Sequence, residues 1–280
     1  MRRTHGYTLV EITIALALML IVTGAVYRLL NLTQRISRVQ AAQLNLQSNV
    51  RTAALVAANE LRGLNTVTGG SPAQNDIVSL TESGITYRAA RGIGFLCQAS
   101  SPGQLRIART SFSGFRDPQP GRDVAYLYSE GSSETATDDS WLPLDVTDVT
   151  AGSGCPGVSA AAISISTTAT GFVAPAGTPV RIYEIMELRL YQSDDQWWLG
   201  ARSVSGGEAI QPLAGPLSGS DGFRLEYLDV WGSGTTDPTA VAGIRITTRG
   251  SSEDVRLAGK ADAAEEELTT QVALRNVPLR

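Results

Sequence analysis

Residues 7–27 read YTLVEITIALALMLIVTGAVY, and this stretch decides the fold. It carries one ionisable carboxylate, Glu11, among apolar and small uncharged side chains. At ~1.5 Å per residue, an α-helix of this length just spans the ~30 Å hydrocarbon core of a bilayer. The stretch therefore predicts a membrane-spanning helix over about residues 7–28.

An ordinary secretory signal is the alternative interpretation. Arg2 and Arg3 precede the apolar run, and small residues near Gly24-Ala25 offer a cleavage site. Two features argue against it. Glu11 is costly in an apolar core and serves nothing in a segment that is discarded. The helical pattern also continues past residue 25.

That continuation is an amphipathic stretch with no proline before Pro72. Gly63 and the cluster at 69–72 are the first strong stop signals. We therefore expect one helix from about Tyr7 to about Arg62, on the order of 80 Å long, with its first half in the membrane and its second half packed on a domain. The apolar positions at helical spacing are Ile36, Val39, Leu46, Val50, Ala53, Ala57, Leu61 and Leu64.

From residue 72 the apolar period changes to two, which is typical of β-strands. Residues 114–123, 129–140 and 150–160 read as loops, and 192–196 as a hairpin loop. Helical segments do not alternate with the strands, so we expect one β-rich, mainly antiparallel domain over residues 63–280 and an α+β fold class. The expected strands are 76–80, 85–90, 105–110, 124–128, 162–167, 180–191, 197–203, 223–230 and 244–248.

Rare residues exclude most catalytic sites. The chain has one histidine, His5, and two cysteines, Cys97 and Cys155, so neither a Ser-His-Asp triad nor a His/Cys zinc site can be built beyond residue 5. No GxxxxGK[ST] phosphate loop occurs. Catalysis by carboxylates alone is not excluded, so an enzyme anchored by one membrane span is one possible function. We expect no enzyme and no cofactor.

Charge is distributed unevenly along the chain, whose net charge is −4. Residues 63–280 carry 16 basic and 25 acidic side chains, which disfavours nucleic-acid binding by this region. Arginines flank both ends of the apolar run: Arg2 and Arg3 precede it, and Arg28, Arg35 and Arg38 follow it. The positive-inside rule therefore does not orient the span by itself.

The residues Gly6-Tyr7-Thr8-Leu9-Val10-Glu11-Ile12, after a basic leader and before an apolar helix, resemble the type IV prepilin signal. The resemblance implies that prepilin peptidase removes leader residues 1–6 by cutting after Gly6 and methylates Tyr7 as the new N-terminus. It implies that Glu11 pairs with the N-terminal amine of a neighbouring subunit. A simple helix-dipole role at the helix start is the alternative for Glu11.

One helix followed by a β-rich head is the pilin-like architecture. Segments 180–203, 211–214, 223–227 and 268–276 resemble the heads of J-type minor pseudopilins and W-type minor pilins. The resemblance implies a minor subunit that helps initiate or cap a type IV pilus or a type II secretion pseudopilus. The alternative is a filament-tip binding module for adhesion or DNA uptake, which an exposed aromatic or basic patch on the head would favour.

The resemblance also implies location and partners. It places the chain in the bacterial inner membrane as a single-pass protein, with its N-terminus in the cytoplasm and its head outside, and in the assembled filament. Implied partners are other pilins or pseudopilins, prepilin peptidase, the inner-membrane assembly platform and membrane lipid. No nucleic-acid partner is implied.

Cys97 and Cys155 fall in the region expected to be exported, where a disulfide persists. We favour one bridge over two separately buried thiols.

Acidic residues in Gly-rich loops lack EF-hand spacing, so we expect solvated side chains and no metal site. Trp141, Trp197, Trp198 and Trp231 are expected to pack in the core and hairpins rather than to form a stacking platform. The loop acids are Asp117, Asp123, Asp138, Asp139, Asp194 and Asp195.

Overall fold

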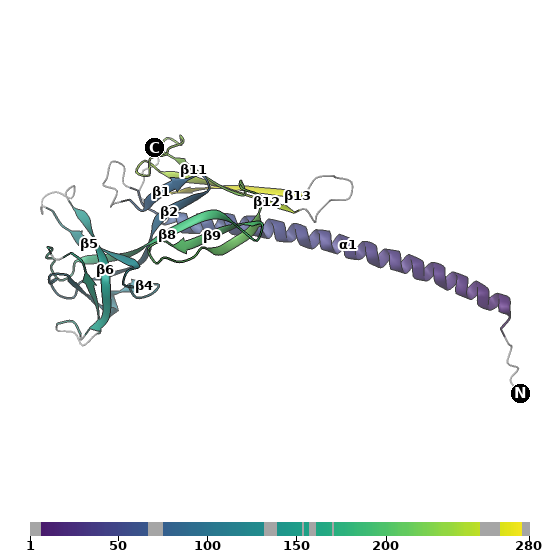
Figure 1. Ribbon diagram of the computed structural model, residues 1–280, viewed down its shortest axis with the longest axis horizontal. Coiled ribbons are helices and arrows are strands. Elements are labelled where there is room, and N and C mark those ends of the chain that lie inside the picture. The colour runs from purple at the N-terminus through teal and green to yellow at the C-terminus, as the bar shows by residue number, and fades with distance from the viewer. Residues whose placement is uncertain are drawn as a thin grey trace, which may run out of the picture. The chain divides into compact units, whose positions relative to one another are not determined.

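The structure is a computed structural model that describes residues 7–66, 75–131, 139–152, 154–156, 161–169, 171–252 and 264–275. It contains one long helix and a mostly antiparallel β-sheet head, which confirms the expected α+β arrangement (Figure 1). The chain divides into two compact units. One comprises residues 1–48 and 251–266, and the other comprises 49–250 and 267–280.

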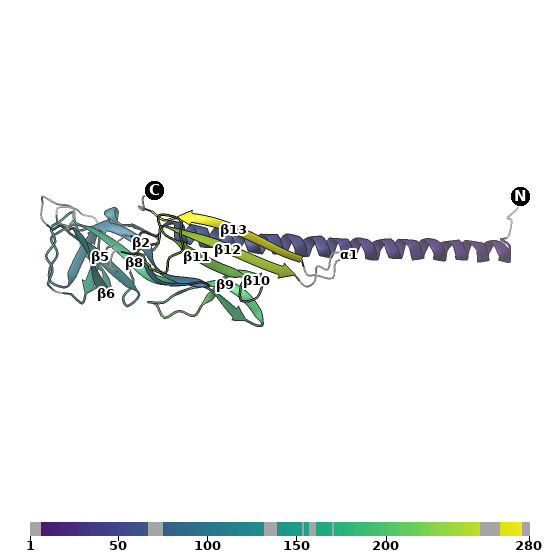
Figure 2. The same cartoon turned by 90° about the horizontal axis from the view of Figure 1, so that it is seen from above.

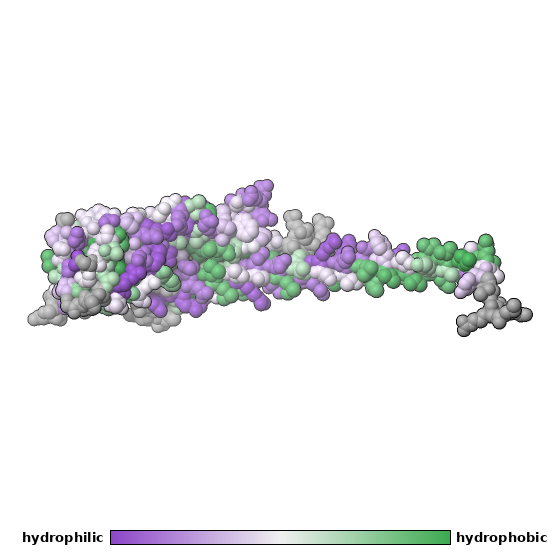
Figure 3. Space-filling view, turned by 90° about the horizontal axis from the view of Figure 1, so that it is seen from below, coloured by the Kyte–Doolittle hydropathy of each residue, from purple (hydrophilic) through white to green (hydrophobic). Residues whose placement is uncertain are grey.

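Helix α1 runs from Leu9 to Arg62 without interruption. Gly63 follows its last residue in a turn, and Leu64 donates its backbone N–H to the Leu61 carbonyl. It is long and apolar enough to cross a membrane, and no part of its most apolar stretch is buried. Hydrophobic surface dominates its N-terminal part, and hydrophilic residues appear further along (Figure 3).

The buried face of α1 is shorter than the sequence pattern predicts. Leu46 and Val50 are buried, whereas Ile36 is 48% exposed and Val39 is only partly covered. Apolar spacing alone does not distinguish residues that face a protein core from residues on an exposed helix. The face that packs therefore begins at about Leu46.

The larger sheet has ten strands in the order β1-β2-β8-β5-β6-β7-β3, with β9 on β8, β10 on β9 and β4 on β2. The second sheet has the order β11-β12-β13. Figure 2 shows both sheets from above. The strands of the larger sheet are β1 Ile77–Thr81, β2 Gly84–Phe95, β3 Gln104–Ala108, β4 Ser113–Gly114, β5 Asp123–Ser129, β6 Ser140–Gly152, β7 Ala162–Thr167, β8 Pro179–Ser193, β9 Gln196–Ser203 and β10 Gln211–Leu217. Those of the second are β11 Phe223–Leu228, β12 Gly243–Ser252 and β13 Ala264–Ala273.

Each expected strand has a counterpart, but β4, β6, β10 and β13 were not predicted. Pro143 and two acidic residues obscure the pattern of β6, which also overlaps the loops expected at 129–140 and 150–160. Strand β10 contains Pro212 and Pro216, which an edge strand tolerates. Strand β13 begins with an acidic run that reads as solvated chain. These are corrections to the sequence interpretation.

The hairpin between β8 and β9 is tighter than expected. Only Asp194 and Asp195 separate the strands, and both have positive φ, 50° and 59°. These angles match a two-residue turn of type I′, whose twist suits the flanking strands, and Asp tolerates them better than most residues. The hairpin loop is therefore these two residues instead of 192–196.

The first core lies where the end of α1 meets both sheets (Figure 1). Ala53 and Ala57 are fully buried, and their small side chains bring the helix backbone close to the strands. Thr248 of β12 donates its hydroxyl to the Val50 carbonyl over 3.1 Å. The largest fully buried side chains of this core are Leu61, Ile85, Tyr87, Leu188 and Phe223.

A second core fills the part of the head built from β3, β5, β6 and β7, with Leu105, Ile107 and Val180 fully buried. The structure joins Cys97, just after β2, to Cys155, between β6 and β7, with their Cα atoms 5.6 Å apart. The two cysteines are 58 residues apart in the sequence. Closing a loop of that length stabilises a fold by about 4 kcal/mol in the chain-entropy model. The bridge in the exported protein stays a prediction.

Strand β8 passes from one core to the other, and Glu184 lies at the crossing. Side chains alternate along a strand, so the even-numbered residues of β8 share one face. On that face Ile182 belongs to the second core and Leu188 to the first. Glu184 lies between them, 1% exposed, and Asp123 of β5 is its direct cross-strand partner. Two carboxylates in direct register repel each other unless cations meet them.

Three arginines supply those cations. Arg91 and Arg116 contact Glu184 Oε2 over 2.6 and 3.1 Å, and Arg122 contacts Oε1. Arg116 also holds Asp123 in a bidentate pair of 2.5 and 2.8 Å. Burial raises the pKa of Glu184, but hydrogen bonds from Ser203, Arg91 and Arg122 outweigh it and lower the pKa to about 2. Glu184 therefore stays ionised at neutral pH.

Replacing Glu184 by Gln removes a buried carboxylate from three arginines that are 22–26% exposed, and we expect a loss of about 1.5–3 kcal/mol in the free energy of unfolding. Chemical denaturation of the full-length protein in nonionic detergent measures it. The matched control is Glu187→Gln on the same strand, whose partly exposed pairs with Arg189 and Arg202 are worth under about 1 kcal/mol. Equal, small losses in the two variants contradict this assignment.

The same carboxylate predicts a pH dependence. Its folded pKa lies below its ordinary value of 4.5, so its stabilisation is complete above about pH 4.5 and is lost as the pH falls through about 2. The wild-type protein should therefore lose more stability than Glu184→Gln between these pH values.

Candidate functional site

The first turn of α1 forms a reciprocal cap around Glu11. The Glu11 Oε2 atom accepts hydrogen bonds from the Thr8 backbone N–H at 2.8 Å and from the Thr8 hydroxyl at 3.0 Å. In return the Glu11 N–H donates to the Thr8 hydroxyl oxygen at 3.3 Å. Thr8 is thus the N-cap residue and Glu11 the third helical residue of a capping box. This arrangement fixes the helix start at Leu9.

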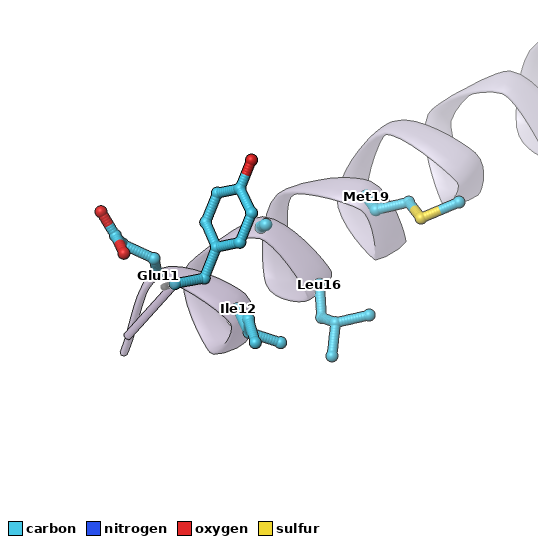
Figure 4. Close-up of a pocket in the computed structure, with 6 residues that line it drawn as sticks. Glu11, Ile12, Leu16 and Met19 are labelled. Carbon is cyan, nitrogen blue, oxygen red and sulfur yellow. The ribbon is translucent and has the colours of Figure 1, made fainter. Parts of the chain in front are cut away.

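The cap uses one carboxylate oxygen and leaves the other available. No described residue hydrogen-bonds to Glu11 Oε1. In Figure 4 the Glu11 carboxylate points away from Ile12 and Leu16. A carboxylate accepts several hydrogen bonds, so Glu11 can keep its Thr8 contact and still accept one from a cation. Glu11 therefore caps the helix through Oε2 and can accept a hydrogen bond from a cation at Oε1.

Apolar side chains surround this carboxylate along the helix. Leu9, Leu20 and Ile21 are among many that stay largely exposed in the structure. Such a continuous apolar surface calls for lipid or other apolar helices around it. In that environment an unpartnered charge costs about 2.5–3.5 kcal/mol near the middle of the membrane.

The two residues expected to undergo processing are only partly described. Tyr7 precedes the cap and is 85% exposed, whereas Gly6 and the rest of leader residues 1–6 lie outside the described residues. After cleavage between Gly6 and Tyr7, the new N-terminal amine would belong to Tyr7, which precedes Thr8. Only Thr8, Leu9 and Val10 lie between the expected new N-terminus and Glu11 in the sequence.

The other expected sites are scattered over the head. Asp123 is buried and ion-paired, so its interpretation as a solvated loop acid was wrong. Asp117 pairs with Arg109 at the surface, and Asp139 accepts a hydrogen bond from the Tyr128 hydroxyl. Asp194 and Asp195 form the β8–β9 turn. Asp138 lies outside the described residues.

The tryptophans divide between packing and exposure. Trp197 packs partly against the first core, and the Arg181 guanidinium lies 4.1 Å from the Trp141 ring centre. Trp231 is 68% exposed in the β11–β12 connection, which corrects the expectation that it packs inside. Within the described ranges no three His, Cys, Asp or Glu residues are grouped to hold a metal ion.

Sequence reasoning missed the capping role of Thr8, although a signal for it exists. A Ser or Thr followed three residues later by Glu, just before an apolar run, is the sequence signature of a capping box. It also missed the Glu184 cluster. That cluster joins residues of β2, β5 and β8 that are far apart in the chain, and no local pattern marks it.

A family model described as the prokaryotic N-terminal methylation motif matches residues 1–27. No curated protein and no solved structure matches the chain. The matched segment contains the Gly6–Tyr7 junction, Glu11 and the apolar run, and it supports a type IV pilin-like protein. The motif implies processing by prepilin peptidase and assembly with other pilins, and together with the apolar helix it fits a membrane-anchored subunit.

We expect the mature chain to begin at Tyr7, because the resemblance to the prepilin signal implies cleavage after Gly6. Intact-mass measurement and N-terminal sequencing of the protein from its native host test this. Removal of residues 1–6 takes away Arg2, Arg3 and His5 and leaves a methylated amine on Tyr7. A mature chain starting near Ala25 would support an ordinary secretory signal instead.

Proposed function

We propose that this protein is a minor pilin or pseudopilin, a structural subunit that helps initiate or cap a type IV pilus or a type II secretion pseudopilus. The observation that carries the proposal is the Glu11 carboxylate. It lies in an exposed apolar helix, within a matched methylation motif, with one oxygen capped by Thr8 and the other open. A capped but incompletely used carboxylate suits a subunit that later meets a cation.

The proposed cycle begins in the inner membrane, with the N-terminus in the cytoplasm and the head outside. Prepilin peptidase cuts and methylates the chain there, and Glu11 stays near the interface, where water lowers its cost. In the filament, helices pack side by side, and low dielectric strengthens a close ion pair while penalising a lone charge. The cation is the methylated amine at the partner subunit's N-terminus.

Such a contact is head-to-tail and does not close on itself. It therefore propagates as a helical filament or adds one subunit to its end. The inner-membrane assembly platform and other pilins or pseudopilins are the proposed partners, and lipid is the solvent of the helix before assembly.

The second candidate function is a filament-tip binding module. It is favoured by one specific observation: the described head displays Phe115, 88% exposed, at the rim of an arginine-lined cavity. This function shares the N-terminal mechanism with the first. The two are compatible in one subunit, because the cap and the cavity use different residues.

We expect Glu11→Gln to leave cleavage and membrane residence intact and to lower incorporation into filaments at least about tenfold, the effect of losing one close ion pair out of water. Immunoblots of sheared filaments and crosslinked pilin complexes measure incorporation, and fractionation measures membrane residence.

The matched control is Thr8→Val, which removes the hydroxyl from the cap and keeps the carboxylate. If Glu11 acted only as a helix cap, both variants would reduce incorporation equally. If Glu11→Gln enters filaments at the wild-type level, the proposed pairing is wrong.

A further inference from the structure

A cavity of about 880 Å³ lies within the unit formed by residues 49–250 and 267–280. The end of α1, β2, β4 and β8 surround it, and Arg275 closes it just after β13. It is far in sequence from Glu11 and Thr8, so neither the N-terminal cap nor the proposed filament pairing uses it.

Arginines give this cavity its chemistry. Arg88, Arg91, Arg181 and Arg275 line it, against the carboxylates of Glu60 and Asp76. Arg91 is committed to Glu184, and Glu60 accepts the Tyr87 hydroxyl hydrogen over 3.0 Å. Neither Arg181 nor Arg275 forms an ion pair with any carboxylate of the described residues. The cavity therefore presents guanidinium groups that can pair with an incoming acid.

The arginines are held in place from outside the cavity. The Arg181 guanidinium stacks on Trp141, and the Arg88 guanidinium lies 6.0 Å from the Tyr126 ring centre while donating to the Asn75 carbonyl. Tyr126 in turn packs edge-on against Tyr183. A guanidinium that is already oriented loses less side-chain entropy when it binds a carboxylate.

Asp76 is the acid built into this arrangement. It faces Arg88 from β2, Arg181 and Tyr183 from β8, Tyr126 from β5 and the backbone N–H of Asn65 after α1. Burial raises the pKa of its carboxyl group to about 6, against the lowering effect of the Asn65 hydrogen bond and the two arginines. At neutral pH its charge competes with any second carboxylate for the same guanidinium groups.

Phe115 adds an apolar contact at the rim. Its backbone N–H donates to the Arg91 carbonyl over 3.1 Å, and the next residue, Arg116, is locked in the Glu184 cluster. Gly114 is required here, because a Cβ at this position would lie 2.7 Å from the Arg91 carbonyl oxygen. An exposed aromatic side chain beside arginines is a common composition for the centre of a protein interface.

We propose that this cavity binds an acidic peptide segment of a partner protein, with Arg181 and Arg275 pairing with its carboxylates and Phe115 covering an adjacent apolar side chain. A peptide is favoured over nucleic acid for two reasons. The surrounding head is acidic, which repels a long polyanion, and the arginines line one local hollow instead of an extended basic track.

Fluorescence anisotropy of a dye-labelled hexaglutamate peptide with the full-length protein in nonionic detergent tests this, with hexaglutamine as the uncharged control. We expect hexaglutamate to bind and hexaglutamine not to bind. Arg181→Gln and Arg275→Gln should each weaken binding about tenfold, the effect of losing one charged hydrogen bond. The matched control Arg224→Gln, at an exposed arginine of β11, should change affinity by less than about twofold.

Asp76→Asn provides an independent readout. In the wild-type protein, hexaglutamate should bind more tightly as the pH falls from about 7.5 to about 5.5, because Asp76 is protonated below about pH 6 and stops competing for the arginines. The variant should bind more tightly than the wild type at about pH 7.5 and lose most of this pH dependence.

Equal binding of the two peptides, or Arg181→Gln and Arg275→Gln both behaving like Arg224→Gln, would overturn the proposal. Tighter, Arg181-dependent binding of a six-residue oligothymidylate would overturn the peptide assignment in favour of nucleic acid. Arg275 is exposed, so its variant keeps the test decisive if Arg181→Gln does not fold. Because no filament is needed, failure here is distinguishable from failure of the Glu11 pairing.

Discussion

A carboxylate in the first turn of an apolar helix needs partners, and in this chain it has one and has room for another. Thr8 satisfies Glu11 Oε2 through its backbone N–H and its hydroxyl, so a single subunit can keep this side chain in a membrane without leaving it unbonded. The other oxygen has no partner among the described residues. The helix around it is apolar and exposed, and it continues unbroken to Arg62, where its last turns enter the first core. Anchoring, capping and packing are thus carried by one continuous element.

The head is organised around a second set of charges, on β8. Its even-numbered side chains serve the two cores, with Glu184 and its three arginines between them. Its odd-numbered residues Arg181 and Tyr183 line the cavity. Because side chains alternate along a strand, one segment supports the interior on one side and a binding surface on the other. Arg91 pairs with Glu184. The other arginines that line the cavity, Arg88, Arg181 and Arg275, favour an acidic ligand.

The local patterns predicted the helix and the strands with a clear period of two. Strands β6, β10 and β13 escaped because Pro143, Pro212 and an acidic run hide their pattern, and sheet pairing overrides such local signals. The roles of Gly6, Tyr7 and Glu11 stay predictions from fixed spacing, and the same spacing could have predicted the capping role of Thr8. The buried pairing of Asp123 with Arg116 could not, since a loop acid looks solvated until the fold brings an arginine to it.

Whether Glu11 changes partner on assembly is measured most directly by electron cryomicroscopy of filaments that contain this subunit, at a resolution that shows side chains. The relevant distance joins the Glu11 carboxylate to the N-terminal nitrogen of the partner subunit. We expect about 2.7–3.5 Å, a charge-assisted hydrogen bond, with the Thr8 contact retained on the other oxygen. A filament in which Glu11 contacts only its own Thr8, with the partner's nitrogen beyond about 6 Å, contradicts it.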